Sequence, residues 1–165
     1  MKIKIHNIGS IVTWSSSENT VKTLTDVEIM IEDNKISDIS SNIKSVDQEI
    51  NAEGALIIPG FIDSHTHPIF IGNRSDEFAL RVKGASYEQI ANCGGGILSS
   101  ITNVRNASEE QLFDESYEKV NLFLSYGTTT IEAKSGYGLT LDDEIKSLKV
   151  IKKINQHSKL EIVPT

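Results

Sequence analysis

Cysteine and positive charge are both scarce in this sequence. The single cysteine, Cys93, cannot form an internal disulfide, which agrees with a reducing compartment. Because neither His6 nor His157 is near Cys93 in sequence to activate it, we expect a small buried or half-buried thiol. The 16 basic and 23 acidic residues give a net charge of −7 without a basic cluster. Nucleic acid and anionic membranes are therefore not expected as partners.

Long apolar runs are absent as well. Residues 1–6 alternate lysine with isoleucine instead of forming an apolar signal segment, and no stretch approaches the length of a membrane span. We therefore expect a cytoplasmic chain without a membrane partner. With 38% hydrophobic and 24% charged residues, its 165 residues are ordinary for a soluble protein and sufficient for a core.

The hydrophobic pattern predicts a small β-rich module over residues 1–58. Ile3 and Ile5 alternate with lysines, and apolar residues alternate again over residues 27–32. Asp33 and Asn34 then supply a turn before another alternating run, which predicts a hairpin.

After Pro59, the pattern predicts strands that alternate with helices. Ser108 and Gln111 form a capping box that opens a helix, and Gly127 is its stop signal. A strand follows over residues 128–133. The next helix, opened by Thr140, is expected to bury a stripe of Leu141, Ile145, Leu148, Ile151 and Ile154, and a third strand begins at Leu160. This order predicts a parallel sheet, either an open doubly wound sheet or the opening of a barrel.

The segment from Pro68 to Ala107 is long for a connection between a strand and a helix, so we expect it to be functional. Ser86 and Gln89 predict a cap for one short helix that ends at Gly94–Gly96. The three glycines follow a helix rather than a strand, which favours a helix stop or a lid hinge over a phosphate-binding loop.

His65 and His67 stand two residues apart at the end of the first strand after Pro59. Side chains at i and i+2 of a strand share a face, so both imidazoles can reach one metal ion while Thr66 points away. The pair alone is weak evidence, but it lies at the carboxyl end of an apolar strand, where α/β barrels place their chemistry. Asp63 either orients a histidine or is an ordinary hydrogen-bonded polar residue near the strand end.

Several other positions are candidates for a ligand site. Arg74 can hold a carboxylate through its planar guanidinium, although composition alone favours a solvated arginine. The loop Ser135–Gly138, which carries Tyr137, follows the second strand and either contacts a ligand or is a simple turn. Glu132 and Lys134 either set the charge of a pocket or form an ordinary ion pair.

Several motifs occur together and in a fixed order. They are Pro59 to His67, Arg74, Gly84 to Tyr87, Gly94 to Ser99 and Glu132 to Leu139. With these motifs, the chain closely resembles the imidazolonepropionase family of the amidohydrolase superfamily, from about Asp26 to Thr165. The His-x-His strand indicates only the superfamily, whereas the glycine-rich loop and the Lys-Ser-Gly-Tyr-Gly segment single out the family.

The resemblance implies a cyclic amidohydrolase of histidine breakdown that converts 4-imidazolone-5-propanoate, a small-molecule substrate, to N-formimidoyl-L-glutamate. It also implies an α/β fold in which residues 59–165 form the first βα units of an incomplete (β/α)8 barrel. Residues 1–58 would be the N-terminal portion of a small β-sandwich. A complete barrel needs about 250 residues, whereas about 107 are present from Pro59 on, so we expect an N-terminal fragment.

The resemblance also implies roles for individual residues. His65 and His67 match the first two ligands of one zinc or iron ion, and Arg74, Tyr87 and Tyr137 match substrate-binding positions. Such an ion lowers the pKa of water from about 15.7 toward 7, and that water would attack the ring carbonyl. The other ligands and the acidic proton-transfer residue are expected beyond Thr165, so the catalytic residue is unassigned and this chain alone is expected to be inactive.

Two alternatives remain open from the sequence. One is another cyclic amidohydrolase or a deaminase of the same superfamily, which shares the His-x-His strand. The other is a non-catalytic truncated module that binds a metal or a partner through an exposed sheet edge. A homodimer is compatible with the resemblance.

Overall fold

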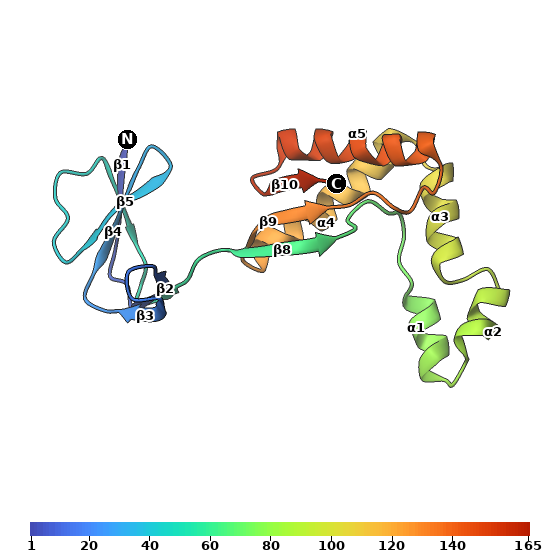
Figure 1. Cartoon of the computed structure of the whole chain (residues 1–165), viewed down its shortest axis with the longest axis horizontal. Helices are drawn as coiled ribbons and strands as arrows, with labels where there is room; N and C mark the ends of the chain where they lie inside the picture. Colours follow the sequence, from blue (N-terminus) through green and yellow to red (C-terminus); the bar gives the residue numbers. More distant parts are fainter. The chain divides into compact units, whose positions relative to one another are not determined.

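The computed structural model describes residues 1–165 and divides them into two units, Met1–Pro59 and Gly60–Thr165 (Figure 1). The first unit contains only strands, and all five helices belong to the second. No helix combines the length and the apolar character that a bilayer crossing demands.

The strands of the first unit form two sheets, one with the order β5-β4-β1-β6 and one with the order β3-β2-β7. Their bounds are β1 Lys2–His6, β2 Ser10–Ser15, β3 Thr20–Leu24, β4 Glu28–Glu32, β5 Lys35–Ser40, β6 Gln48–Asn51 and β7 Leu56–Ile57. β4 and β5 pair antiparallel around Asp33 and Asn34, whose φ values are +50° and +62°. Tight hairpin turns need this left-handed backbone, and the predicted hairpin is confirmed.

A parallel sheet with the order β10-β9-β8 lies at the centre of the second unit. Its strands are β8 Phe61–Thr66, β9 Thr128–Ala133 and β10 Glu161–Pro164, and the connecting helices are α4 Glu109–Ser125 and α5 Leu141–His157. α4 and α5 pack against each other, α4 against β9 and α5 against β10 (Figure 1). The predicted alternation of strands and helices with parallel pairing is confirmed.

The N-terminal caps of α4 and α5 are those predicted from the sequence. The Ser108 side chain accepts from the Gln111 backbone, and the Gln111 side chain accepts from the Ser108 backbone, which completes the predicted capping box. At the start of α5, the Thr140 hydroxyl accepts from the backbone N–H of Asp143. Between the helices and the sheet lies a buried cluster that includes Leu112, Val120, Ile131, Ala133, Val150, Ile151, Ile154, Leu160 and Ile162.

The buried face of α5 differs from the expected stripe. Its buried residues are Ser147, Val150, Ile151 and Ile154, a spacing of three, four and seven from the first. Leu141 is 77% exposed, and Ile145 and Leu148 are also exposed. The expected stripe was too wide because it joined two neighbouring helix faces, and only one of them meets the sheet.

The long connection after β8 contains three helices, α1 Ser75–Val82, α2 Tyr87–Asn92 and α3 Ile97–Asn106. Only α2 was expected, and its capping box of Ser86 and Gln89 is present. α1 and α3 begin without a side-chain cap, so the usual sequence signal for a helix start is missing. Cys93, expected to be buried or half-buried, is exposed at the end of α2. That expectation was wrong because the end of a short helix leaves the thiol in solvent.

Truncation of Ile154 to alanine should destabilise the second unit by about 2–5 kcal/mol, because the fully buried side chain would leave a cavity between α5 and the sheet. The helical circular dichroism signal reports this unit alone, since every helix lies in it. Urea unfolding should show an earlier transition for Ile154→Ala and little change for the exposed neighbour Lys152→Ala. Equal transitions in the two variants would contradict this packing.

Candidate active site

The two histidines of the His-x-His pair lie side by side at the end of β8. Their ring centroids are 5.3 Å apart, with an interplanar angle of 73°. The His65 side chain is 69% exposed, whereas His67 is half-buried. The structure therefore brings the two imidazoles within reach of one small ligand, and one of them is open to solvent.

A bulge shapes this end of β8. Asp63 pairs with Ile131 and Thr66 with Ala133, so β8 contains one more residue than β9 over this stretch. Such a bulge bends a strand and redirects its side chains, and it is common beside functional sites. The Thr66 hydroxyl donates to the backbone oxygen of Glu132 at 2.5 Å, and the Asp63 carboxylate accepts from the backbone N–H of His65 at 3.2 Å. Asp63 therefore orients the His65 backbone and makes no hydrogen bond to an imidazole ring.

His67 packs against the loop that follows β9. A Cβ atom on Gly136 would lie 3.0 Å from Cε1 and 3.2 Å from Nδ1 of His67, and Gly136 has a φ of +130°. Both facts favour glycine at this position. Nδ1 of His67 is buried and has no hydrogen-bond partner. A buried polar atom without a partner is costly, so this ring suits a group that the surrounding residues do not supply.

Glu132 places a negative charge next to the histidines. Its carboxylate lies 3.9 Å from Nδ1 of His65 and 3.0 Å from Nζ of Lys134. The hydrogen bond from Lys134 lowers the pKa of the Glu132 carboxyl, which remains charged near neutral pH. Glu132 and Lys134 thus form an ion pair that also borders the candidate site. No cluster of three or more histidine, cysteine, aspartate or glutamate side chains is arranged to hold a metal ion.

Arg74 is the N-cap residue of α1 and is held by Glu77. Nε and Nη2 of Arg74 lie 2.8 and 2.7 Å from the same oxygen, Oε2 of Glu77. The other oxygen, Oε1, accepts from the backbone N–H of Gly96 at 2.9 Å. The hydrogen bond from Arg74 lowers the pKa of the Glu77 carboxyl. One edge of the guanidinium is thus occupied, and Nη1 remains for another anion.

Arg74 and Tyr137 line the same cavity, which has a volume of about 300 Å³. Its lining residues are Phe70, Ile71, Gly72, Asn73, Arg74, Ser99, Ser100, Asn103 and Tyr137. The ring centroids of Tyr137 and His67 are 5.5 Å apart, so Tyr137 links the cavity to the histidine pair. His65 and His67 are not among the lining residues, but the His67 ring contacts Tyr137, so the histidine pair lies next to the cavity that Arg74 and Tyr137 line.

Tyr87 is not among the residues that line this cavity. It is the first residue of α2 and is 65% exposed, and its hydroxyl would lie 3.6 Å from a Cβ atom on Gly96. The glycine-rich segment therefore separates two helices, and Gly96 lies beside Tyr87 with a positive φ of +75°. The sequence interpretation missed Glu77 and the cavity-lining face of α3. An arginine and a glutamate three residues apart at a helix start would have indicated the first of these.

Comparison with known proteins shows what this chain is similar to in sequence and in fold. No protein-family model matches it. It is 41% identical over 160 residues to an imidazolonepropionase of Thermoanaerobacter pseudethanolicus, covering 96% of this chain and 39% of that protein. It is 46% identical over 145 residues to an imidazolonepropionase of Flavobacterium psychrophilum, covering 85% of this chain and 35% of that protein. The chain thus spans less than half the length of these curated relatives.

Two solved structures share the fold at low sequence identity. An atrazine chlorohydrolase variant of Arthrobacter aurescens, complexed with zinc and atraton, has a TM-score of 0.61 and 20% identity, covering 99% of this chain and 35% of that chain. N-isopropylammelide isopropylaminohydrolase of Burkholderia multivorans has a TM-score of 0.61 and 17% identity, and the match covers 99% of this chain and 37% of that chain. The structural similarities support the fold. Over the residues compared, this chain is similar in sequence to imidazolonepropionases.

Proposed function

We propose that this chain supplies part of the active site of a metal-dependent hydrolase that opens the ring of 4-imidazolone-5-propanoate to give N-formimidoyl-L-glutamate. The observation that carries the proposal is that the His65 and His67 pair contacts Tyr137, which lines one cavity together with Arg74. The sequence identity to imidazolonepropionases supports the same substrate. The reaction would serve histidine degradation.

In this proposal, His65 and His67 hold one zinc or iron ion together with ligands from outside these residues. The unpartnered Nδ1 of His67 and the closeness of the two rings support a metal, as does the zinc named for a structural neighbour. Imidazole nitrogens suit both zinc and iron. The ion, when bound, would polarise a carbonyl and lower the pKa of water. Glu132 would keep the surroundings of His65 negative.

Arg74 and Tyr137 would bind the two ends of the substrate. The free Nη1 edge of Arg74 suits the propionate carboxylate, because a guanidinium forms strong charge-assisted hydrogen bonds. Tyr137 would pack on the flat ring between the cavity and the histidines. Tyr87, exposed beside Gly96, would contribute to the same substrate only at the outer rim.

We also propose that residues 59–165 form the first βα units of a (β/α)8 barrel and that residues 1–58 form the N-terminal part of a small β-sandwich. The parallel order β10-β9-β8 and the placement of the histidines at the carboxyl end of β8 support the barrel. The two small sheets of the first unit support the sandwich.

The isolated chain should bind zinc weakly and hydrolyse no 4-imidazolone-5-propanoate, because two imidazoles fall short of the three protein ligands typical of catalytic zinc. Calorimetric titration with zinc and a turnover assay would measure both. His65→Ala and His67→Ala should each abolish the weak binding, whereas His157→Ala, on an exposed helix end, should leave it unchanged. Measurable turnover by the isolated chain would refute this expectation.

A chimera tests the substrate. When this chain replaces the matching segment of the Thermoanaerobacter pseudethanolicus relative, the product should hydrolyse 4-imidazolone-5-propanoate. Arg74→Gln in this chimera should raise KM by about 10- to 150-fold, the size expected for a lost charged hydrogen bond. Arg81→Gln, an exposed arginine on α1, is the matched control and should keep KM. Faster hydrolysis of dihydroorotate or guanine would instead favour another activity of the superfamily.

A further inference from the structure

Helix α3 is connected at its N-terminus to Arg74. The backbone N–H of Gly96, which precedes the helix, donates to Oε1 of Glu77, and Oε2 of Glu77 accepts from Arg74. Gly96 has a φ of +75° and a ψ of −154°, a backbone conformation open mainly to glycine. The start of α3 and the Arg74 guanidinium are therefore held by the same carboxylate.

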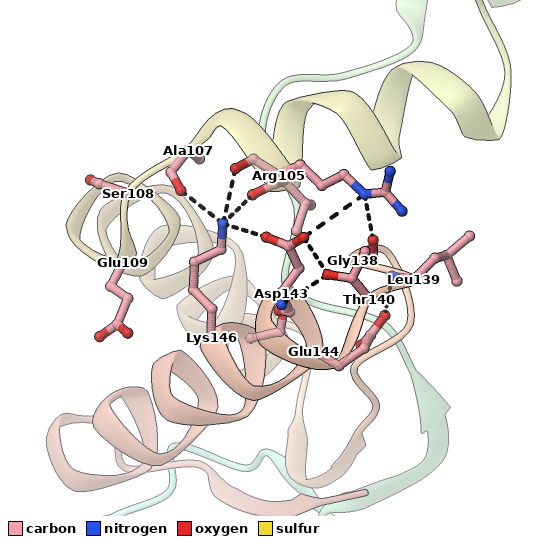
Figure 2. Close-up of polar contacts among 12 residues, drawn as sticks. Arg105, Ala107, Ser108, Glu109, Gly138, Leu139, Thr140, Asp143, Glu144 and Lys146 are labelled. Carbon is pink, nitrogen blue, oxygen red and sulfur yellow. Dashed lines mark hydrogen bonds and ion pairs between the residues drawn. The ribbon is translucent and has the colours of Figure 1, made fainter.

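The C-terminus of α3 is fastened to α5 by Lys146 (Figure 2). Nζ of Lys146 donates to the backbone oxygens of Val104 at 2.9 Å, Arg105 at 3.1 Å and Ala107 at 3.1 Å. It also lies 3.0 Å from Oδ1 of Asp143. The last carbonyl groups of a helix lack partners within the helix, and a lysine there complements the helix dipole. Lys146 thus fixes where α3 ends.

Arg105, in the last turn of α3, reaches the loop that carries Tyr137. Nε of Arg105 donates to the backbone oxygen of Gly138 at 2.7 Å and lies 3.9 Å from Oδ2 of Asp143 (Figure 2). On the other side of the loop, the backbone N–H of Leu139 donates to Oε1 of Glu144 at 2.6 Å. Leu139 has a φ of +54°, which a leucine adopts only when its surroundings hold it there.

The face of α3 that lines the cavity lies between these two attachments. Ser99, Ser100 and Asn103 line the same cavity of about 300 Å³ as Arg74 and Tyr137. The helix is therefore a wall of the cavity and also connects the segments that carry Arg74 and Tyr137. A ten-residue helix is about 15 Å long and stiff, so its length limits how far the two attachments can shift.

We propose that α3 acts as a spacer that sets the separation of Arg74 from Tyr137, and that this separation selects the length of the acid arm on a planar ring ligand. Arg105 is the positioning residue at one end of the spacer, and Glu77 is the positioning residue at the other. Neither contacts the reacting ring: Arg105 acts through the Gly138 carbonyl, and Glu77 acts through Arg74. The inference rests on the proposed function, because it takes Arg74 and Tyr137 as the ligand-binding pair.

The experiment uses the full 165-residue chain and two probes that differ by one methylene, imidazole-4-propanoate and imidazole-4-acetate. The unchanged chain should bind the propanoate about 10-fold more tightly, the effect expected of one methylene in a fitted site. In Arg105→Met this preference should disappear, and the amide of Leu139 should exchange its hydrogen about 5-fold faster as the loop loosens. NMR titration and hydrogen exchange measure the two effects.

Two further variants separate positioning from a general loss of stability. Arg105→Lys retains a donor that can reach the Gly138 carbonyl and should restore part of the preference. Arg81→Met, which removes an exposed arginine from α1, should bind both probes as the unchanged chain does. If Arg105→Met fails to fold, Glu77→Gln tests the other end and should also abolish the preference.

The outcomes distinguish this inference from the proposed function. Suppose that the unchanged chain binds the propanoate more tightly than the acetate. If Arg105→Met or Glu77→Gln keeps this preference, or weakens the binding of both probes equally, the spacer role is wrong and the ligand assignment stands. If the unchanged chain binds neither probe, the ligand assignment fails. In that case, unaltered exchange of Leu139 in Arg105→Met would overturn the positioning role as well.

Discussion

The parallel pairing of β8 with β9 is the constraint on which the candidate site depends. It brings His65 and His67 beside Glu132 and the loop after β9, although more than 60 residues separate them in the chain. Two hydrogen bonds join the strands at this point, from the backbone N–H of Lys134 to the Thr66 oxygen and from the Thr66 hydroxyl to the Glu132 oxygen. The apolar cluster beneath β9 gives this pairing its stability, because α4 and α5 cover the sheet only when the strands are aligned.

Much of this framework could be predicted from local sequence signals. The capping boxes at Ser86 and Ser108, the Asp33-Asn34 turn and the alternation of strands and helices are short-range features, and each is found in the structure. The closeness of His65 and His67 was also expected, because side chains two residues apart in a strand share a face, although His67 lies one residue beyond the end of β8. What these features have in common is that neighbours along the chain determine them.

The features that escaped prediction depend on contacts between distant segments. The bulge between Asp63 and Thr66 depends on how β8 pairs with β9, and no residue type in β8 predicts it. α3 follows Gly96 without a side-chain cap, and the backbone of Gly96 is held by Glu77, 19 residues earlier. The buried face of α5 was misplaced for the same reason, since the sheet and not the helix decides which apolar residues are covered.

The hold of Glu77 on Arg74 also affects the entropy of ligand binding. A long, flexible arginine ordinarily loses rotational freedom when it grips an anion, at a cost of about 0.5–1.5 kcal/mol for each immobilised side chain. Here two contacts with one carboxylate oxygen have already restricted the guanidinium during folding. Much of the ordering has therefore happened before an acid arrives, and more of the attraction at Nη1 remains as net affinity.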